Sequence, residues 1–295
     1  MIVVKLSDGL GNQMFQYAAA RSLSLKWNEK LLMDTASFGI DFPNVDKRIF
    51  SLNIFDNIKP AFSSRFLTGS FYMPSRWDNR FRKIIRQPRR HVLKENKHAF
   101  DESFYQTIPP VLLDGYWQSE MYFKPFEKTI REDFTFRSID GSDHNFPLLA
   151  EIQDCESVSV HVRRGDYYKY GNQNMFQGIC DKPYFQKAIS WFLVNKRKPK
   201  FFFFSEDPEW IFDNLKSELI NMTVVSGNLG DSSWKDMFLM SKCKHQILSN
   251  SSFSWWSAWL NKNGEKSVIA PIKWFNTEDP LYEPNDIVPA HWIRL

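Results

Sequence analysis

Short hydrophobic runs, each followed by a polar loop and an amphipathic stretch, organise the N-terminal part of the chain. Residues 2–6 (Ile-Val-Val-Lys-Leu) predict a buried strand, residues 7–12 a tight polar loop, and the Ala-rich residues 13–27 a helix. A second short strand is predicted over residues 30–34. A strand, a loop and a helix in this order are typical of the first unit of a parallel α/β sheet.

From residue 157 onward the alternation of strands and helices becomes regular. Runs that predict strands, with helical stretches between them, cover residues 158–162, 201–204, 222–225, 246–248 and 267–270. Asp207 before Pro208 predicts a helix start, and Gly264 predicts the end of a helix that begins at Ser254. Strands that alternate with helices predict a parallel, doubly wound, Rossmann-like sheet.

The middle of the chain is less regular. Residues 35–110 show no clear periodicity, whereas residues 111–115 predict a buried strand. A helix is predicted over residues 119–132, with Ser119 as its cap and Pro125 as a kink.

The length of the chain and one polar stretch predict two domains. At 295 residues the chain exceeds the usual size of one domain. Residues 138–156 are polar and rich in turn formers, so we expect the boundary there, with one Rossmann-like domain over residues 1–145 and a second over residues 146–295.

Composition and charge exclude several classes of protein. With 43% hydrophobic and 24% charged residues, the chain is neither disordered nor fibrous. Its net charge of +4 does not require a nucleic-acid partner, and we expect none. Cys155, Cys180 and Cys243 lie far apart and lack ligand spacing, which favours a reducing compartment and disfavours structural zinc.

Two features bear on localisation. The apolar start of the chain, residues 1–4, is too short for a signal-peptide core, and no stretch approaches the roughly 18 apolar residues of a membrane span, so we expect a cytoplasmic protein. Residues 76–97 contain nine Lys and Arg against two acidic residues, interleaved with aromatic and aliphatic ones. They suggest peripheral contact with the inner face of a membrane that presents a lipid-linked glycan, although a solvated basic face, a loop beside a binding cleft or RNA binding are alternatives.

Basic residues follow the first strand of the second domain. Because side chains alternate along a strand, Val158, Val160 and Val162 share one face, and His161 and Arg163 share the other. Ligands bind at the carboxyl ends of strands in doubly wound sheets, and a guanidinium fork matches the oxygens of a diphosphate. The alternative is an Arg–Asp ion pair that closes a turn.

Two further segments suggest ligand contacts. The first, between a strand and a helix, is Ser249-Asn250-Ser251-Ser252-Phe253-Ser254. Its hydroxyl and N–H groups suit an anion, but for this segment taken alone plain helix capping is the preferred interpretation. The second is the loop Gly9-Leu10-Gly11-Asn12-Gln13-Met14. Met14 replaces the third glycine of a dinucleotide fingerprint and no Gly-Lys-Ser/Thr follows, so this loop predicts close backbone approach to some ligand, or a simple tight turn.

These segments together resemble the α-1,2-fucosyltransferases of glycosyltransferase family 11. The resemblance rests on residues 9–18, 161–167 and 249–256, and residues 114–119 are similar as well. It implies a GT-B-like α/β fold, with two Rossmann-like domains whose parallel sheets face a cleft. It also implies an inverting enzyme that needs no metal, and the chain indeed lacks the Asp-x-Asp pair that often holds a divalent cation on a nucleotide sugar.

The resemblance also implies substrates and roles. GDP-fucose is expected in the C-terminal domain, and a galactose-terminated glycan acceptor mainly in the N-terminal one. The residues expected to bind the donor are His161, Arg163, Arg164, Gly165, Asn250, Ser251, Ser252 and Phe253. Those expected to act in catalysis are Arg163, Asp166 and Asn12. Those expected on the acceptor side are Asp8, Gly11, Asn12 and Gln13.

Some positions and some functions stay open. Asp8 stands where many members of the family carry glycine, and Asp166 comes before Asp8 as a candidate for the catalytic base. A transferase of the same fold with another acceptor is an alternative function. A non-catalytic sugar-binding protein would explain the 11 Trp and 27 Phe, but it has no use for Arg163 and Arg164. A dinucleotide-dependent oxidoreductase is disfavoured by the incomplete glycine fingerprint.

Overall fold

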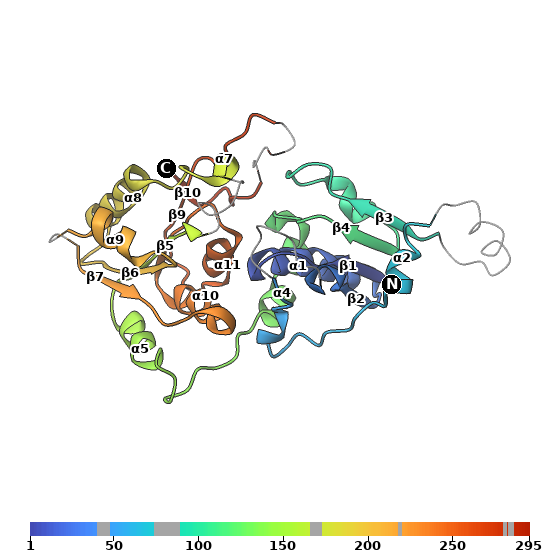
Figure 1. Cartoon of the computed structure of the whole chain (residues 1–295), viewed down its shortest axis with the longest axis horizontal. Helices are drawn as coiled ribbons and strands as arrows, with labels where there is room; N and C mark the ends of the chain where they lie inside the picture. Colours follow the sequence, from blue (N-terminus) through green and yellow to red (C-terminus); the bar gives the residue numbers. More distant parts are fainter. Residues whose placement is uncertain (40–47, 74–88, 166–172, 218–219, 280–281, 283–285) are drawn as a thin grey trace. The chain divides into compact units, whose positions relative to one another are not determined.

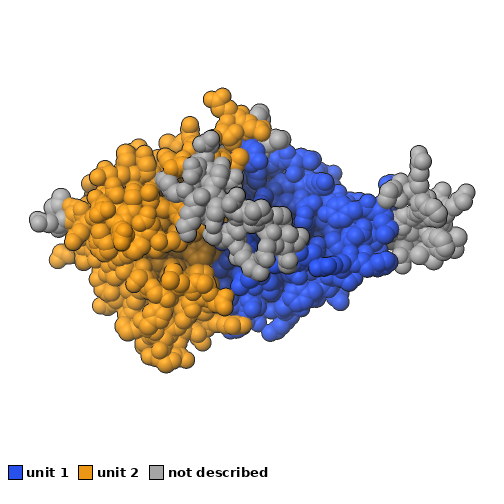
Figure 2. Space-filling model, viewed as in Figure 1, with its two compact units in different colours: residues 1–135, 280–287 blue, residues 136–279, 288–295 orange. Residues whose placement is uncertain are grey.

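The computed structural model describes residues 1–39, 48–73, 89–165, 173–217, 220–279, 282 and 286–295. Contacts divide the chain into two compact units, coloured separately in Figure 2. Unit 1 comprises Met1–Thr135 and Pro280–Ile287, and unit 2 comprises Phe136–Asp279 and Val288–Leu295. This division falls after Thr135, earlier than the boundary expected after residue 145, and the chain returns to unit 1 near its end, which the sequence did not predict.

Unit 1 is built on a parallel sheet. Its described strands are β1 (Ile2–Lys5), β2 (Leu31–Asp34), β3 (His91–Lys94) and β4 (Val111–Asp114). They lie in the order β2-β1-β4-β3, and every pair is parallel. The long helix α1 (Leu10–Trp27) follows β1 directly (Figure 1). On one face of the sheet, Val3, Leu32 and Leu112 form a buried cluster with Phe71.

Two expectations for unit 1 need correction. Helix α1 begins at Leu10 rather than at residue 13, because the Gly9 carbonyl already accepts hydrogen bonds from the backbone N–H groups of Asn12 and Gln13. The helix expected over residues 119–132 is wrong: two 3₁₀ turns, Glu120–Tyr122 and Lys124–Phe126, precede the short α4 (Glu127–Asp133). Pro125 lies inside the second turn, where it cannot donate the hydrogen bond that a continuous helix needs.

The remaining elements of unit 1 come from the stretch that showed no periodicity. They are the short helix α2 (Arg65–Gly69), the strand β3, and the 3₁₀ turns Ala36–Gly39, Leu52–Ile54 and Glu102–Gln106.

Unit 2 contains a six-stranded parallel sheet. Its strands are β5 (Ser157–Val162), β6 (Lys200–Ser205), β7 (Met222–Val225), β8 (His245–Ile247), β9 (Val268–Ala270) and β10 (Ile293–Arg294). They lie in the order β10-β9-β8-β5-β6-β7, which is the order of a doubly wound, Rossmann-like sheet. The predicted fold class of two parallel α/β sheets is therefore confirmed.

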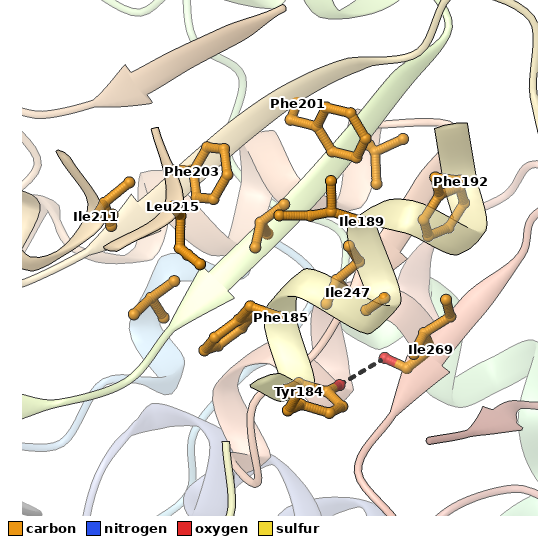
Figure 3. Packing of buried hydrophobic residues seen from close by; sticks show 14 residues of the cluster. Tyr184, Phe185, Ile189, Phe192, Phe201, Phe203, Ile211, Leu215, Ile247 and Ile269 are labelled. Atoms are coloured by element: carbon orange, nitrogen blue, oxygen red, sulfur yellow. Dashed lines mark hydrogen bonds between the residues drawn. The ribbon is translucent and has the colours of Figure 1, made fainter. Parts of the chain in front are cut away.

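Helices cover both faces of this sheet (Figure 1). They are α5 (Phe146–Asp154), α7 (Gln173–Phe176), α8 (Lys182–Asn195), α9 (Pro208–Leu215), α10 (Trp234–Lys242) and α11 (Ser252–Leu260). Strand β6 shows the layering directly, because its four phenylalanines are all buried and alternate between faces. Phe201 and Phe203 pack against α8 and α9, as Figure 3 shows, while Phe202 and Phe204 pack against α5 and α10.

Two expectations for unit 2 were wrong. The stretch 138–156, expected to be mainly turns, contains α5, whose Leu148, Leu149 and Ile152 pack against the second face of the sheet. Helix α11 ends at Leu260 with Asn261 as its cap, not at Gly264. The Asn261 amide donates to the Cys243 carbonyl, which fixes the chain as it leaves the helix.

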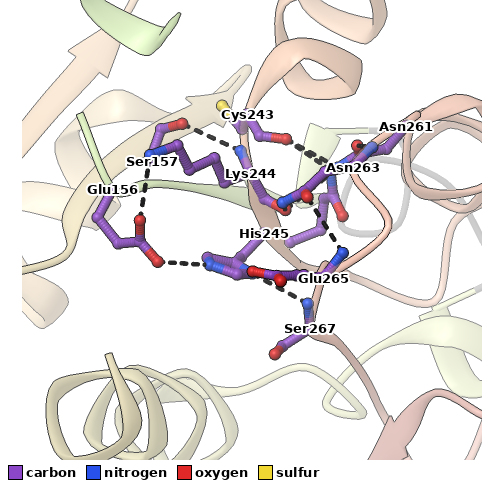
Figure 4. Close-up of polar contacts among 10 residues, drawn as sticks. Glu156, Ser157, Cys243, Lys244, His245, Asn261, Asn263, Glu265 and Ser267 are labelled. Atoms are coloured by element: carbon purple, nitrogen blue, oxygen red, sulfur yellow. Dashed lines mark hydrogen bonds and ion pairs between the residues drawn. The ribbon is translucent and has the colours of Figure 1, made fainter. Parts of the chain in front are cut away.

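A polar cluster closes the amino edge of this sheet (Figure 4). His245 Nδ1 accepts the backbone N–H of Ser267 at 2.9 Å, so its proton lies on Nε2, which donates to Glu156 at 2.9 Å. Burial lowers the pKa of His245, which favours this neutral form. These contacts join three parallel strands at their starts, and they lie at the edge opposite to the one where ligands bind.

Candidate functional site

Each sheet has a switch point, where the order in which strands are added to the sheet reverses. The residues singled out from the sequence lie at these two points. In unit 2 the chain runs from β5 outward to β6 and β7, and then returns to β8 on the other side of β5. In unit 1 it runs from β1 to β2, and β4 lies on the other side of β1. The carboxyl ends of such strand pairs bind ligands in open α/β sheets. The structure therefore offers one candidate site in each unit.

In unit 2, the end of β5 is joined to the loop after β8. Ser249 Oγ donates to the His161 carbonyl at 2.6 Å, and the backbone N–H of Arg163 donates to the same hydroxyl at 3.1 Å. Tyr184, on α8, donates its hydroxyl to the Leu248 carbonyl at 2.6 Å. This network holds Arg163 beside the start of α11.

The alternation predicted along β5 is confirmed. Val158, Val160 and Val162 lie together in the core beneath α8 and α9, so His161 projects from the other face. His161 is 5% exposed, and its ring lies 5.8 Å from that of Phe253. Burial, and the charge of Arg163, lower the pKa of His161 to about 3, so the ring is neutral at pH 7. Its Nδ1 has no hydrogen-bond partner among the described residues, which leaves a buried polar atom for a ligand or water.

The two arginines meet two acidic residues that follow β6. Arg163 forms an ion pair with Glu206, and Arg164 Nε lies 3.0 Å from Asp207 Oδ2. The Arg164 guanidinium also lies 4.6 Å from the ring centre of Trp210. Asp207 caps α9 as well, since it accepts the backbone N–H of Trp210 at 3.1 Å. Both pairs are partly exposed to a similar extent, and the Arg164–Asp207 pair matches the turn-closing alternative.

The serines at the start of α11 do what a helix cap does. Ser251 Oγ accepts the Phe253 N–H at 3.3 Å, while Ser252 and Phe253 are half-buried. The Asn250 amide donates to the carbonyls of Phe176 and Trp274, so it organises this loop. Contacts of these residues with a phosphate stay a prediction.

Two further predicted site residues directly follow Arg164: Gly165, expected to bind the donor, and Asp166, expected to act in catalysis. A Cβ on Gly165 would lie 3.5 Å from the Glu206 carboxyl, in ordinary contact, so close packing does not require glycine there. Asp166, the first candidate for the base, lies outside the described residues.

In unit 1, the glycine loop is fixed by a buried glutamine. Asp8 adopts a φ of 61°, a backbone region that non-glycine residues rarely visit. Gln13 is fully buried: its amide donates to the carbonyls of Asp8 and Ile49, and its oxygen accepts the Ser51 N–H. Gln13 therefore shapes the loop, and Gly11 is buried within the helix.

Two residues after β4 also belong to this candidate site in unit 1, and sequence reasoning missed both. The Gln118 amide donates to Asn12 Oδ1 at 2.9 Å, and the Tyr116 phenol interacts electrostatically with the Asp8 carboxylate. The available signal was the position of the Asp114–Ser119 stretch directly after a buried strand. Glu206 was missed in the same way, although it follows the Phe-rich β6.

The described residues include no group of three or more His, Cys, Asp or Glu side chains arranged to hold a metal ion. Within the same residues, no helix combines the length and the apolar character needed to cross a membrane. Residues 74–88, which include most of the basic segment 76–97, lie outside the described part of the chain.

Comparison with known proteins identifies the family. The family model for glycosyl transferase family 11 matches residues 1–295. An α-1,2-colitosyltransferase of Escherichia coli is 31% identical over 100% of this chain and 99% of its own, and the O-antigen biosynthesis glycosyltransferase WbnK of Escherichia coli is 32% identical over 98% and 99%. Human galactoside α-(1,2)-fucosyltransferase 1 is 28% identical over 63% of this chain and 53% of its own.

Among solved structures, the fucosyltransferase NodZ from Bradyrhizobium is similar in fold. Its TM-score is 0.51 at 17% sequence identity, over 87% of this chain and 91% of NodZ. Because the family model spans every residue and two relatives match along their whole length, this chain belongs to glycosyl transferase family 11.

Proposed function

We propose that the protein transfers L-fucose from GDP-β-L-fucose to the 2-hydroxyl of a galactoside, with inversion at the anomeric carbon. One observation carries the proposal: Arg163 lies at the switch point of a Rossmann-like sheet, beside the start of α11. This is where such sheets bind nucleotides, and a guanidinium suits their phosphates. Family membership and the names of the relatives supply the sugar and the linkage.

The reaction requires a good leaving group. The acceptor oxygen attacks the anomeric carbon of fucose as the bond from that carbon to the GDP oxygen breaks, and negative charge develops on the diphosphate. Arg163 and the N–H groups at the start of α11 would stabilise this charge. Arg164, paired with Asp207, would keep the end of β5 in place for Arg163. His161, neutral and buried, would offer a ring nitrogen to the nucleotide.

The acceptor hydroxyl must lose its proton. A carboxylate would take it, with Asp166 as the first candidate and Asp8 as the second, or the proton would leave late from a loose transition state. The Gln118 amide donates to the side-chain oxygen of Asn12, so the N–H₂ group of Asn12 would stay available for a sugar hydroxyl. We expect this chemistry to need no metal ion, because cationic side chains neutralise the diphosphate.

A second donor deserves a direct test. The α-1,2-colitosyltransferase relative matches the whole chain at 31% identity. A colitosyl group is a fucosyl group without its 3-hydroxyl, so the same phosphate contacts would serve GDP-colitose.

The experiment offers both donors to the purified chain. GDP-fucose or GDP-colitose is supplied with a panel of galactosides, GDP release is measured, and the linkage of the product is determined by NMR. An α-1,2-linked fucosyl galactoside is the expected product. Transfer from GDP-colitose alone would reassign the donor, and GDP release without a glycoside product from any acceptor would contradict the proposed reaction.

A further inference from the structure

The loop after β4 has a backbone conformation that one carboxylate explains. Trp117 is buried and adopts a φ of 58°, in the left-handed region that bulky residues avoid. Glu95 Oε2 accepts the N–H of Tyr116 at 2.6 Å, and Glu95 Oε1 accepts the N–H of Trp117 at 3.0 Å. A Cβ on Gly115 would lie only 2.4 Å from the Glu95 Cβ, so glycine lets the loop close over this carboxylate. Two charge-assisted hydrogen bonds thus hold the loop in an otherwise costly shape.

The shape of the loop determines what unit 1 presents at its switch point. The residues on either side of the buried Trp117 lie against the glycine loop, where the Tyr116 phenol interacts electrostatically with Asp8 and the Gln118 amide donates to Asn12. Tyr116 is 36% exposed, so part of its ring is open to a sugar. An aromatic ring beside amide and carboxylate groups is the surface that a galactoside needs, since its apolar face stacks and its hydroxyls form hydrogen bonds.

We propose that Glu95 is a positioning residue for the acceptor: its carboxylate holds Tyr116 and Gln118 where they bind the galactoside together with Asp8 and Asn12. This inference rests on the proposed function. Glu95 itself touches no substrate and acts only through the two backbone N–H groups that it binds.

The protonation state of Glu95 makes this role sensitive to pH. Burial raises the pKa of Glu95 to about 7, although its two backbone hydrogen bonds oppose the shift. Below this pH the carboxyl carries a proton, and its hydroxyl oxygen is a poor acceptor for an N–H group. Acceptor affinity should therefore fall as the pH drops from 8 to 6.

Two phenols interact with Glu95 and bring further groups near it. Tyr116 also interacts with Asp8 and Tyr282 and stacks on His98, and Tyr122 also interacts with Asp101 and Asp286. Burial raises the pKa of both phenols, which stay neutral, and lowers the pKa of His98, which is also neutral at pH 7. Interactions within the 101–103 turn lower the pKa of Asp101, so it is ionised throughout.

Global stability should respond to pH in the opposite direction. Since the folded pKa of Glu95 lies above its ordinary value of 4.5, the folded state binds more protons than the unfolded state between pH 4.5 and 7. The contribution of Glu95 to stability therefore falls as the pH rises through this window, while acceptor affinity rises. A purely structural role would make both quantities move together.

The test compares Glu95→Gln with the matched control Glu102→Gln, an exposed residue of the same unit. Steady-state kinetics with GDP-fucose and a galactoside give the KM for the acceptor, and calorimetry gives the Kd for GDP. We expect Glu95→Gln to raise the acceptor KM about tenfold at pH 8 and to abolish its rise toward pH 6, because the amide can satisfy only one of the two N–H groups. The Kd of Glu95→Gln for GDP and the acceptor KM of Glu102→Gln should each stay within twofold of the wild-type value.

Tyr116→Phe provides a second measurement if Glu95→Gln does not fold. It removes the phenol hydroxyl that interacts with Asp8 and leaves the Glu95 carboxylate in place, so the acceptor KM should rise severalfold without a change in GDP affinity. An unchanged acceptor KM in either folded variant, or a pH profile that Glu95→Gln leaves intact, overturns the proposal. Either of these two outcomes would leave the proposed function unaffected. A wild-type protein that transfers no sugar from either donor would overturn both the proposed function and the role of Glu95.

Discussion

Replacement of Arg163 by alanine should weaken GDP binding by a factor that the structure bounds. A hydrogen bond to a charged group contributes about 1.5–3 kcal/mol. In the free protein, Arg163 already pairs with Glu206, and breaking such a partly exposed pair costs about 0.2–1 kcal/mol. The net loss is then roughly 0.5–2.8 kcal/mol, which corresponds to an about 2- to 100-fold higher Kd for GDP.

Titration calorimetry with GDP measures this loss, and thermal unfolding verifies that each variant is folded. Arg197→Ala is a matched control, since Arg197 is exposed and precedes β6 at the opposite edge of the same sheet. Arg163→Lys should restore only part of the affinity, because an ammonium group keeps the charge but lacks the planar fork.

Glu206→Gln tests the competing ion pair. It removes the negative charge that occupies Arg163, so GDP should bind up to about fivefold more tightly, in line with the roughly 1 kcal/mol limit for an exposed pair. A Kd for Arg163→Ala within twofold of wild type would refute the assignment of the donor site. Weaker binding by Glu206→Gln would refute the idea that Glu206 competes with phosphate.

Three further results are expected. Transferase activity should persist in the presence of EDTA. A complete loss of activity that added metal reverses would overturn the proposal that Arg163 neutralises the charge of the diphosphate. Burial raises the pKa of Asp236 from 3.8 to about 6, so its ionisation destabilises the folded state as the pH rises through that window. Asp236→Asn should therefore raise the free energy of unfolding by about 1 kcal/mol at pH 7.5 but by little at pH 4. Urea unfolding at the two pH values measures this difference. In sedimentation, the chain should bind anionic liposomes at low salt and be released at high salt. Binding should be lost when Arg82, Arg86, Arg89 and Arg90 are replaced by Gln. Equal pelleting of this variant and the wild type would contradict membrane contact through residues 76–97.

Unit 2 could be predicted well because its strands are buried on both faces. The run of phenylalanines in β6 and the valines of β5 give signals that no surface strand gives. By contrast, β3 is half-buried and ends in an exposed Lys94, and β10 has only two residues, so neither produces a hydrophobic run. The pattern of Leu148, Leu149 and Ile152 in α5 was available, but the polar residues before it drew attention to a turn instead.

The candidate site was predictable only where it lies in one continuous segment. Arg163 stands out because it follows a buried strand, and that inference needs no knowledge of its neighbours. Glu206 and Tyr116 follow other strands, and only the strand order brings them to Arg163 and Asp8. Glu95 is harder still, because its role depends on two backbone N–H groups about twenty residues away, and no side-chain pattern records such contacts.

The path of the chain between the units has a consequence for synthesis on the ribosome. Domains generally fold as they emerge, the N-terminal one first. Unit 1 cannot finish in this way, because it also contains Pro280–Ile287. Within that return segment, Tyr282 stacks on His98 with ring centres 5.0 Å apart, and Asp286 accepts the Phe100 N–H at 3.0 Å. Unit 1 is translated first, but its last contacts form only after nearly the whole polypeptide has been made. In a nascent chain stalled before residue 280, unit 1 would lack its return segment and the sheet of unit 2 would lack β10.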